Sequence, residues 1–115
     1  MSWDVIVYNS DHIPESLDDS DPEDELPLGT PAEVRALISK TLTTTIWGED
    51  GSGVYDGGDN LFIEIYPGDE DPVANIFMSV KALDEIRACQ EVLRILKAGG
   101  WWAMDCSSDE ILAPE

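Results

Sequence analysis

Residues 61–66 (LFIEIY) and 75–80 (NIFMSV) decide the fold of this chain. Both segments are rich in β-branched and aromatic residues, which favour β-strands. Between them, residues 67–72 (PGDEDP) contain the proline, glycine and aspartate that are typical of turns. The three segments together predict an antiparallel β-hairpin.

Alternation along these strands separates two faces, because successive strand side chains point to opposite sides of a sheet. The aliphatic set is predicted to lie beneath helices: Leu61, Ile63, Ile65, Ile76, Met78 and Val80. The other set leaves Phe62, Tyr66 and Phe77 on an open face, where we expect Trp102 to join them. A third covering element, a homodimer or a partner would hide such a patch. We favour a homodimer through Phe62, Tyr66 and Phe77.

The first helix is predicted after residue 30 by three signals that agree. Thr30 can serve as the N-cap, Pro31 occupies the first helical position, and Glu33 completes a capping box. Apolar residues then follow at helical spacing: Val34, Leu37, Ile38 and Thr41 or Leu42.

A second helix is predicted over residues 82–98, where Gly99 and Gly100 end it. Its predicted apolar stripe contains Ile86, Cys89, Leu93 and Leu96, widened by Ala82 and Val92.

Further strands are predicted over residues 3–8, 43–47 and 101–105, with a short additional pairing at 54–55. The order is then β-α-β-β-β-α-β, one strand more than the ferredoxin-like pattern. We therefore expect an α+β fold: a mostly antiparallel sheet of four to five strands with two helices on one face. The length and the apolar fraction of 43% predict one domain over residues 1–115.

Charge restricts the partners that this domain can have. Six Lys and Arg residues against 25 Asp and Glu residues give a net charge of −19. Such a field repels phosphate, so we expect neither direct nucleic-acid binding, including base stacking on the open face, nor binding to membranes. A basic protein is the expected partner. The alternative interpretation is a solvated acidic surface that only prevents aggregation.

The compartment is predicted from what the sequence lacks. No secretory signal and no membrane-spanning segment is recognisable. Cys89 and Cys106 are too few for a disulfide framework. We therefore expect a cytoplasmic protein with reduced thiols.

A long acidic loop is predicted over residues 9–29, which contain eight acids, three prolines and no Lys or Arg. Its self-repulsion favours a mobile loop, with or without a function. Together with the acids of the 67–72 turn it supplies the predicted electrostatic contacts. These are Asp19, Asp21, Glu23, Asp24, Asp69, Glu70 and Asp71. Tyr66 and Trp102 are the predicted aromatic anchors, because interface hot spots favour Tyr and Trp.

The sequence contains no recognisable catalytic or phosphate-binding motif, and we predict no cofactor and no specific metal. The acidic run lacks the ligand order of an EF-hand. Two enzymatic alternatives are a nucleophile at Cys106 activated by His12, and a carboxylate pair in a hydrolase. The first prediction is a non-catalytic acidic binding domain, in the style of an inhibitor or immunity-type partner of a basic protein. A small homo-oligomeric scaffold ranks second.

Overall fold

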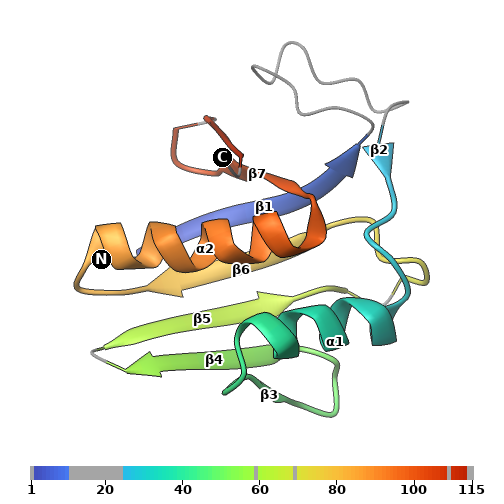
Figure 1. Ribbon diagram of the computed structural model, residues 1–115, viewed down its shortest axis with the longest axis horizontal. Coiled ribbons are helices and arrows are strands. Elements are labelled where there is room, and N and C mark those ends of the chain that lie inside the picture. Colours follow the sequence, from blue (N-terminus) through green and yellow to red (C-terminus); the bar gives the residue numbers. More distant parts are fainter. Residues whose placement is uncertain (1, 11–24, 59, 69, 109, 114–115) are drawn as a thin grey trace.

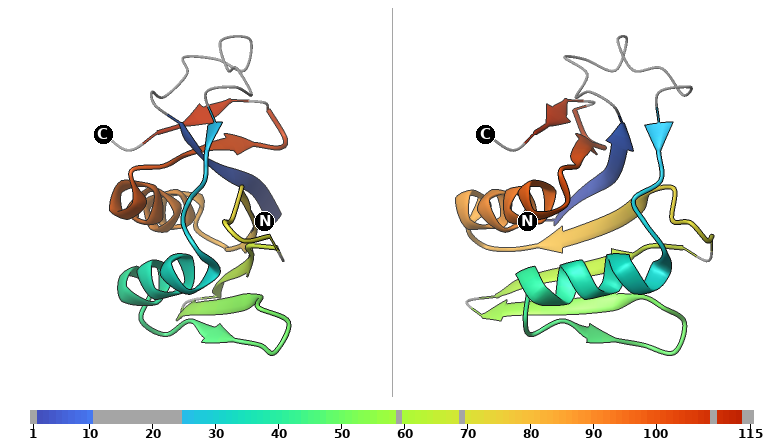
Figure 2. Two further views of the ribbon diagram at one scale, coloured as in Figure 1. Left: turned by 90° about the vertical axis from the view of Figure 1, so that its right-hand side faces the viewer. Right: turned by 45° about the vertical axis from the view of Figure 1, so that its right-hand side comes forward.

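The computed structural model describes residues 2–10, 25–58, 60–68, 70–108 and 110–113. These residues form an α+β structure in which both helices lie on the same face of an antiparallel sheet (Figure 1 and Figure 2). The predicted fold class is therefore confirmed. The prediction of a mobile acidic loop over residues 9–29 falls for the most part on residues 11–24, which lie outside the described residues.

The sheet has more strands than the predicted four to five. Its continuous path runs in the order β3-β4-β5-β6-β1-β7-β8, and β2 pairs with one end of β1. Every described pairing is antiparallel. The bounds are β1 Ser2–Ser10, β2 Glu25–Leu26, β3 Ile46–Trp47, β4 Gly53–Gly58, β5 Leu61–Tyr66, β6 Ile76–Lys81, β7 Trp102–Asp105 and β8 Ile111–Leu112.

The predicted strand over residues 43–47 is reduced to Ile46–Trp47 by the end of the preceding helix. Thr45 turns back toward that helix, because its backbone N–H and its hydroxyl both donate to the carbonyl of Leu42, at 3.1 and 2.7 Å. The short pairing predicted at 54–55 is instead the full strand β4, which forms a hairpin with β5. The predicted order β-α-β-β-β-α-β therefore misses β2, β4 and β8.

Helix α1, Pro31–Thr41, begins as the sequence predicts. The Glu33 N–H donates to Thr30 Oγ1 at 3.2 Å, and Glu33 Oε1 accepts from the Thr30 N–H at 3.2 Å. This capping box satisfies two backbone donors that a helix start otherwise leaves unpaired. Val34 and Ile38 are buried against the sheet, as their spacing predicts.

Helix α2, Glu85–Gly99, starts later than predicted, because Asp84 caps it by accepting from the backbone N–H groups of residues 86 and 87. The predicted stripe was wrong at Ile86, which is 72% exposed. Ala88, Val92, Ile95 and Leu96 are the buried residues instead. At the end of the helix a side chain at Gly99 has no room, because a Cβ there would come within 2.4 Å of the Trp101 ring.

The main core lies between the helices and the sheet. The six aliphatic residues predicted from alternation along β5 and β6 are all 0–1% exposed. Val5 and Val7 of β1 and Ala103 of β7 continue the same core. One face of the sheet is thus fully used for packing, which leaves the other face as the place to look for a binding surface.

Candidate protein-binding surface

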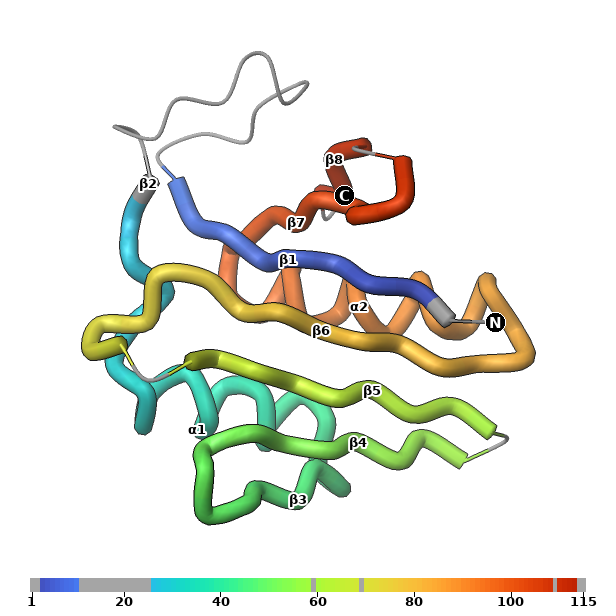
Figure 3. Tube along the Cα trace, turned by 180° about the vertical axis from the view of Figure 1, so that it is seen from behind, coloured from blue at the N-terminus to red at the C-terminus, as the bar shows by residue number. Residues whose placement is uncertain are grey.

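The face of the sheet opposite the helices is turned toward the viewer in Figure 3, where β4, β5, β6 and β1 pass in front of α1 and α2. Among the described residues, no helix covers this face. Buried and exposed residues alternate along β5 and β6, and the exposed ones are the side chains that point to this face. We call this side of the sheet the open face.

Five apolar side chains, one from each of five neighbouring strands, form a row across the open face. The register pairs Tyr66 with Phe77, and Phe77 with Ile6. It continues from Ile6 to Met104, and from Met104 to Ile111. Directly paired residues of antiparallel strands share a face and contact one another. We call these five residues the apolar row.

The row is most exposed at its β5–β6 end. Tyr66 is 42% exposed and Phe77 is 37% exposed, whereas Ile6, Met104 and Ile111 are half-buried. The Tyr66 and Phe77 rings are tilted by 43° with their centroids 6.0 Å apart. Phe62, on the same face but outside the row, is 40% exposed. The predicted exposure of these three aromatic residues is therefore confirmed.

Trp102 occupies the predicted side of the sheet, but the prediction that it is exposed was wrong. Its ring stacks on Tyr8, its cross-strand partner, with centroids 4.9 Å apart. Its indole Nε1–H donates to Ser10 Oγ at 2.9 Å, and only 3% of the residue is exposed. Because β6 and β1 separate β7 from β5, Trp102 also lies roughly 14 Å from Tyr66 along the sheet. The two predicted anchors are not brought together.

A carboxylate lies beside the exposed end of the row. Glu64, two residues before Tyr66 on β5, accepts a hydrogen bond from the Tyr66 hydroxyl, and its other oxygen is 3.3 Å from Lys81 Nζ. The Tyr66 hydrogen bond, followed by Lys81, lowers the pKa of Glu64. The same hydrogen bond, with smaller contributions from burial and nearby carboxylates, raises the pKa of Tyr66.

A second carboxylate approaches Tyr66 from the turn between β3 and β4. Asp50 accepts hydrogen bonds from the Ser52 hydroxyl at 2.7 Å and from the Ser52 N–H at 3.0 Å. These two bonds lower the pKa of Asp50, which keeps it charged. The Asp50 charge contributes to the raised pKa of Tyr66. Tyr66 thus hydrogen-bonds to Glu64, and its pKa is also raised by the charge of Asp50.

Two of the acids predicted as partner contacts lie close to this end of the row. Glu70 and Asp71 are exposed in the connection that begins after Tyr66 and leads to β6. Glu70 also borders a hollow of about 190 Å³ that Pro67, Gly68, Ala74 and Asn75 complete. The other predicted contacts are outside the described residues: Asp19, Asp21, Glu23, Asp24 and Asp69.

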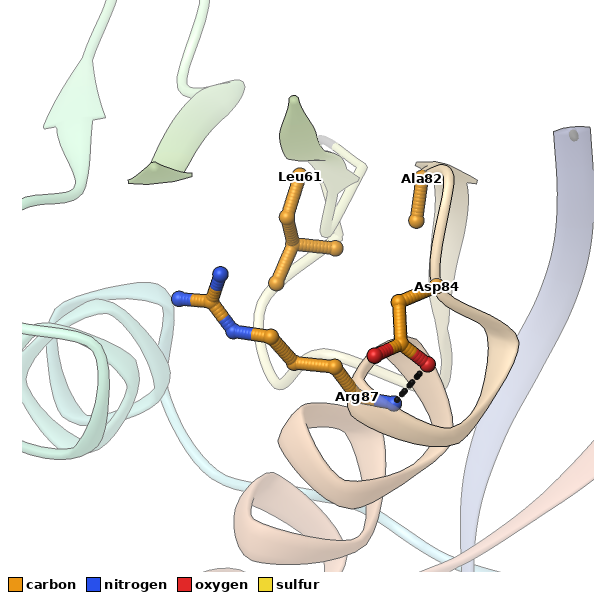
Figure 4. A pocket seen from close by; sticks show the side chains of 4 residues that line it. All are labelled: Leu61, Ala82, Asp84 and Arg87. Carbon is orange, nitrogen blue, oxygen red and sulfur yellow. Dashed lines mark hydrogen bonds between the residues drawn. The ribbon is translucent and has the colours of Figure 1, made fainter. Parts of the chain in front are cut away.

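A separate pocket of about 280 Å³ lies at the start of α2 and is lined by Leu61, Ala82, Asp84 and Arg87 (Figure 4). Its polar groups have structural roles. Asp84 caps α2, and the Arg87 guanidinium donates to the carbonyl oxygen of Gly57, near the end of β4. Arg87 therefore connects α2 to β4, and Asp84 stabilises the start of α2.

In the described part of the chain, the side chains of the two enzymatic alternatives are not brought together into a site. Cys106 is exposed and Cys89 is half-buried, while His12 lies outside the described residues. Within the described ranges, no group of three or more His, Cys, Asp or Glu side chains is arranged to hold a metal ion.

Charge is distributed unevenly between the two helices and the rest of the chain. Helices α1 and α2 contain three acids and five of the six basic residues, a formal charge of +2. The remainder of the chain contains 22 acids and only Lys81, a formal charge of −21. The five helical bases are Arg35, Lys40, Arg87, Arg94 and Lys97. The acidic character of this protein therefore belongs to its strands and connections.

Comparison with known proteins gives no relative for this chain. No protein-family model matches it, and no similar protein is found among curated proteins or among solved structures. In the described residues, neither helix has the length and apolar character needed to cross a membrane.

Proposed function

We propose that this protein is a non-catalytic domain that binds a basic protein, in the manner of an inhibitor or immunity-type partner. The uneven distribution of charge carries this proposal. The helices carry a formal charge of +2 and the remainder of the chain −21, so the acidic excess lies outside the helices. Clustered charge of one sign steers an oppositely charged partner and raises its association rate.

The edges of the sheet support binding through a face. The continuous sheet ends in β3 at one side and β8 at the other, and each of these strands has only two residues. Short edge strands offer few unpaired backbone groups to an added strand. A partner would therefore meet side chains on the open face and the acidic connections around it.

Two features extend the proposal. Cys89 and Cys106 are not joined in a disulfide, which supports the cytoplasm as the compartment. A second candidate function, a homo-oligomeric scaffold, is favoured by the joint exposure of Phe62, Tyr66 and Phe77 on one face. In that case a second copy of the chain would cover these rings.

Capture at two salt concentrations tests the main proposal. The immobilised full chain is exposed to cell extract at ~50 and ~500 mM salt, and a retained protein is identified and purified for kinetic measurement. We expect a basic protein whose association rate falls steeply with salt while its dissociation rate changes little. Retention of no basic protein at the lower salt concentration would contradict the proposal.

Two double variants that remove equal charge sharpen this test. Glu70→Gln with Asp71→Asn removes two exposed charges from the connection between β5 and β6 and should slow association several-fold. Glu33→Gln with Glu85→Gln removes two charges from the helix layer, and Gln at position 33 can still complete the capping box. We expect no change for the helix pair. Equal slowing by both pairs would show that net charge alone matters.

A further inference from the structure

We propose that the apolar row is the docking stripe for the basic partner, and that its Tyr66–Phe77 end seats an arginine side chain of that partner. This inference rests on the proposed function and adds the location and the chemistry of recognition. It begins from the row itself, whose five strands span roughly 19 Å at about 4.8 Å per strand spacing. No described helix lies over it.

The two sides of the row differ in character. On one side, the residues two positions away along the strands are Glu64, Ser79 and Asp4, which are polar and paired with one another across the strands. On the other side, the stacked Tyr8 and Trp102 rings lie beside the β1–β7 end. A partner would therefore place apolar side chains on the row and positive charge on the side of Glu64 and Asp4.

The groups that would bind an arginine side chain lie at the most exposed end of the row. The Phe77 and Tyr66 rings offer aromatic surface, and the Tyr66 hydroxyl holds the Glu64 carboxylate beside them. A guanidinium can stack on a ring and at the same time donate to a carboxylate, which a compact ammonium does less well. Asp50 adds a second negative charge near Tyr66. These groups together define the arginine seat.

Lys81 already contacts Glu64, but this contact does not prevent an arginine from binding there. Its side chain is 59% exposed, and its Nζ is 3.3 Å from the carboxylate. Exposed pairs of this kind contribute little to stability, because water screens the attraction and the lysine side chain loses freedom. An arginine that also stacks on the aromatic rings would therefore compete with Lys81 for Glu64.

Charge excludes a second copy as the favoured occupant. Two open faces brought together would oppose Asp4, Asp56 and Glu64 to the same carboxylates, with only Lys81 as a basic residue among the strands. Like charges across an interface suppress association. A basic partner neutralises these carboxylates, whereas a copy of this chain, at −19, adds to their repulsion.

Titration with two capped hexapeptides of alternating glycine and either arginine or lysine tests the seat. Backbone NMR shifts are followed at ~50 mM salt, where screening is weak. We expect the arginine peptide to bind more tightly and to shift Tyr66, Phe77 and Glu64 most. Glu64→Gln and Phe77→Ala should each weaken its binding by about three- to ten-fold, the effect of losing a charged hydrogen bond or a ring contact.

Matched controls keep charge loss and aromatic loss separate from the seat. Glu85→Gln removes an exposed acid at the start of α2, and Phe62→Ala removes an exposed ring on the same face outside the row. Both should weaken binding less than two-fold. If Glu85→Gln acts as strongly as Glu64→Gln, the seat is wrong, while binding to a basic protein still stands on the capture experiment. A wild-type dimer in sedimentation that Phe77→Asp dissociates would make a second copy the occupant and overturn the inference.

Discussion

The two faces of the sheet are built from the same strands but have different surroundings. Along β5, Leu61, Ile63 and Ile65 are buried beneath the helices, while Phe62 and Tyr66 remain exposed on the open face. The difference lies less in hydrophobicity than in shape, because the buried set is aliphatic and the exposed set is aromatic. Aliphatic side chains interdigitate closely in a core, whereas exposed aromatic rings are typical anchors at interfaces.

The charged groups of the two layers differ in the same way. In the helix layer, Arg94 donates to Glu91 at 2.8 Å and to the carbonyl of Thr41 at 3.0 Å, which ties α2 to α1. Arg87 ties α2 to the end of β4. Basic residues therefore fasten the helix layer together, and the acids elsewhere are left with Lys81 as their basic neighbour among the strands. A basic partner would reduce their mutual repulsion.

The largest effect that we expect is a loss of stability when a buried residue of β5 is shortened, compared with an exposed residue of the same strand. Ile63→Ala removes a side chain with no exposed surface, and should lower the free energy of unfolding by about 3 to 4 kcal/mol. Phe62→Ala, one residue away on the open face, should lower it by less than about 1 kcal/mol. Urea denaturation followed by circular dichroism measures both. Similar losses for the two variants would mean that the open face is packed in solution.

Trp102 is the exception on the open face, and its replacement gives the second largest effect. Trp102→Ala removes the stack on Tyr8 and the hydrogen bond to Ser10, and should lower the free energy of unfolding by about 2 to 3 kcal/mol. Trp102→Phe keeps a ring and should lower it by roughly 1 kcal/mol. The same urea experiment decides. An unchanged free energy of unfolding in Trp102→Ala would show that this ring is exposed, as the sequence predicted.

Much of the fold could be predicted, because strong local patterns agreed with the tertiary structure. Thr30 and Glu33 form the predicted capping box, and alternation along β5 and β6 assigned both faces correctly. The errors arose where a distant contact decided. Ile86 was assigned to the buried stripe of α2, but the helix packs through Ala88, Val92, Ile95 and Leu96 and leaves Ile86 exposed. Strand β8 has two residues, too few for a pattern.

The candidate site was predicted in part. Exposure of Tyr66 and Phe77 followed from alternation, but the extension of their row to Ile6, Met104 and Ile111 depends on strand order and register. Neither can be determined from a single strand, because any two strands of suitable length can be paired on paper. The stacking that buries Trp102 has the same origin. The uneven charge could have been noticed, since the basic residues fall within the predicted helices.

The smallest effect concerns the Glu64–Tyr66 contact, which makes the open face sensitive to pH only at its extremes. The hydrogen bond lowers the pKa of Glu64 below 4.5 and raises the pKa of Tyr66 above 10. A lowered carboxylate pKa means that the stabilisation is lost as pH falls through the folded value, and a raised tyrosine pKa means that it is lost as pH rises through the folded value. The contact therefore persists between these limits.

Side-chain NMR titration can follow each group separately. Tyr66→Phe should return the pKa of Glu64 toward 4.5, although Lys81 still lowers it, and Glu64→Gln should return the pKa of Tyr66 toward 10. Tyr55→Phe is the control and should leave the pKa values of Glu64 and Tyr66 unchanged. The pKa of Tyr55 is raised by burial and by Glu91, which do not involve the Glu64–Tyr66 contact. If Tyr66 keeps its raised pKa in Glu64→Gln, Asp50 or burial holds it there. If Asp50 is the cause, Asp50 of the β3–β4 turn is the main carboxylate near the Tyr66 ring, and we would expect an arginine to contact Asp50 before Glu64.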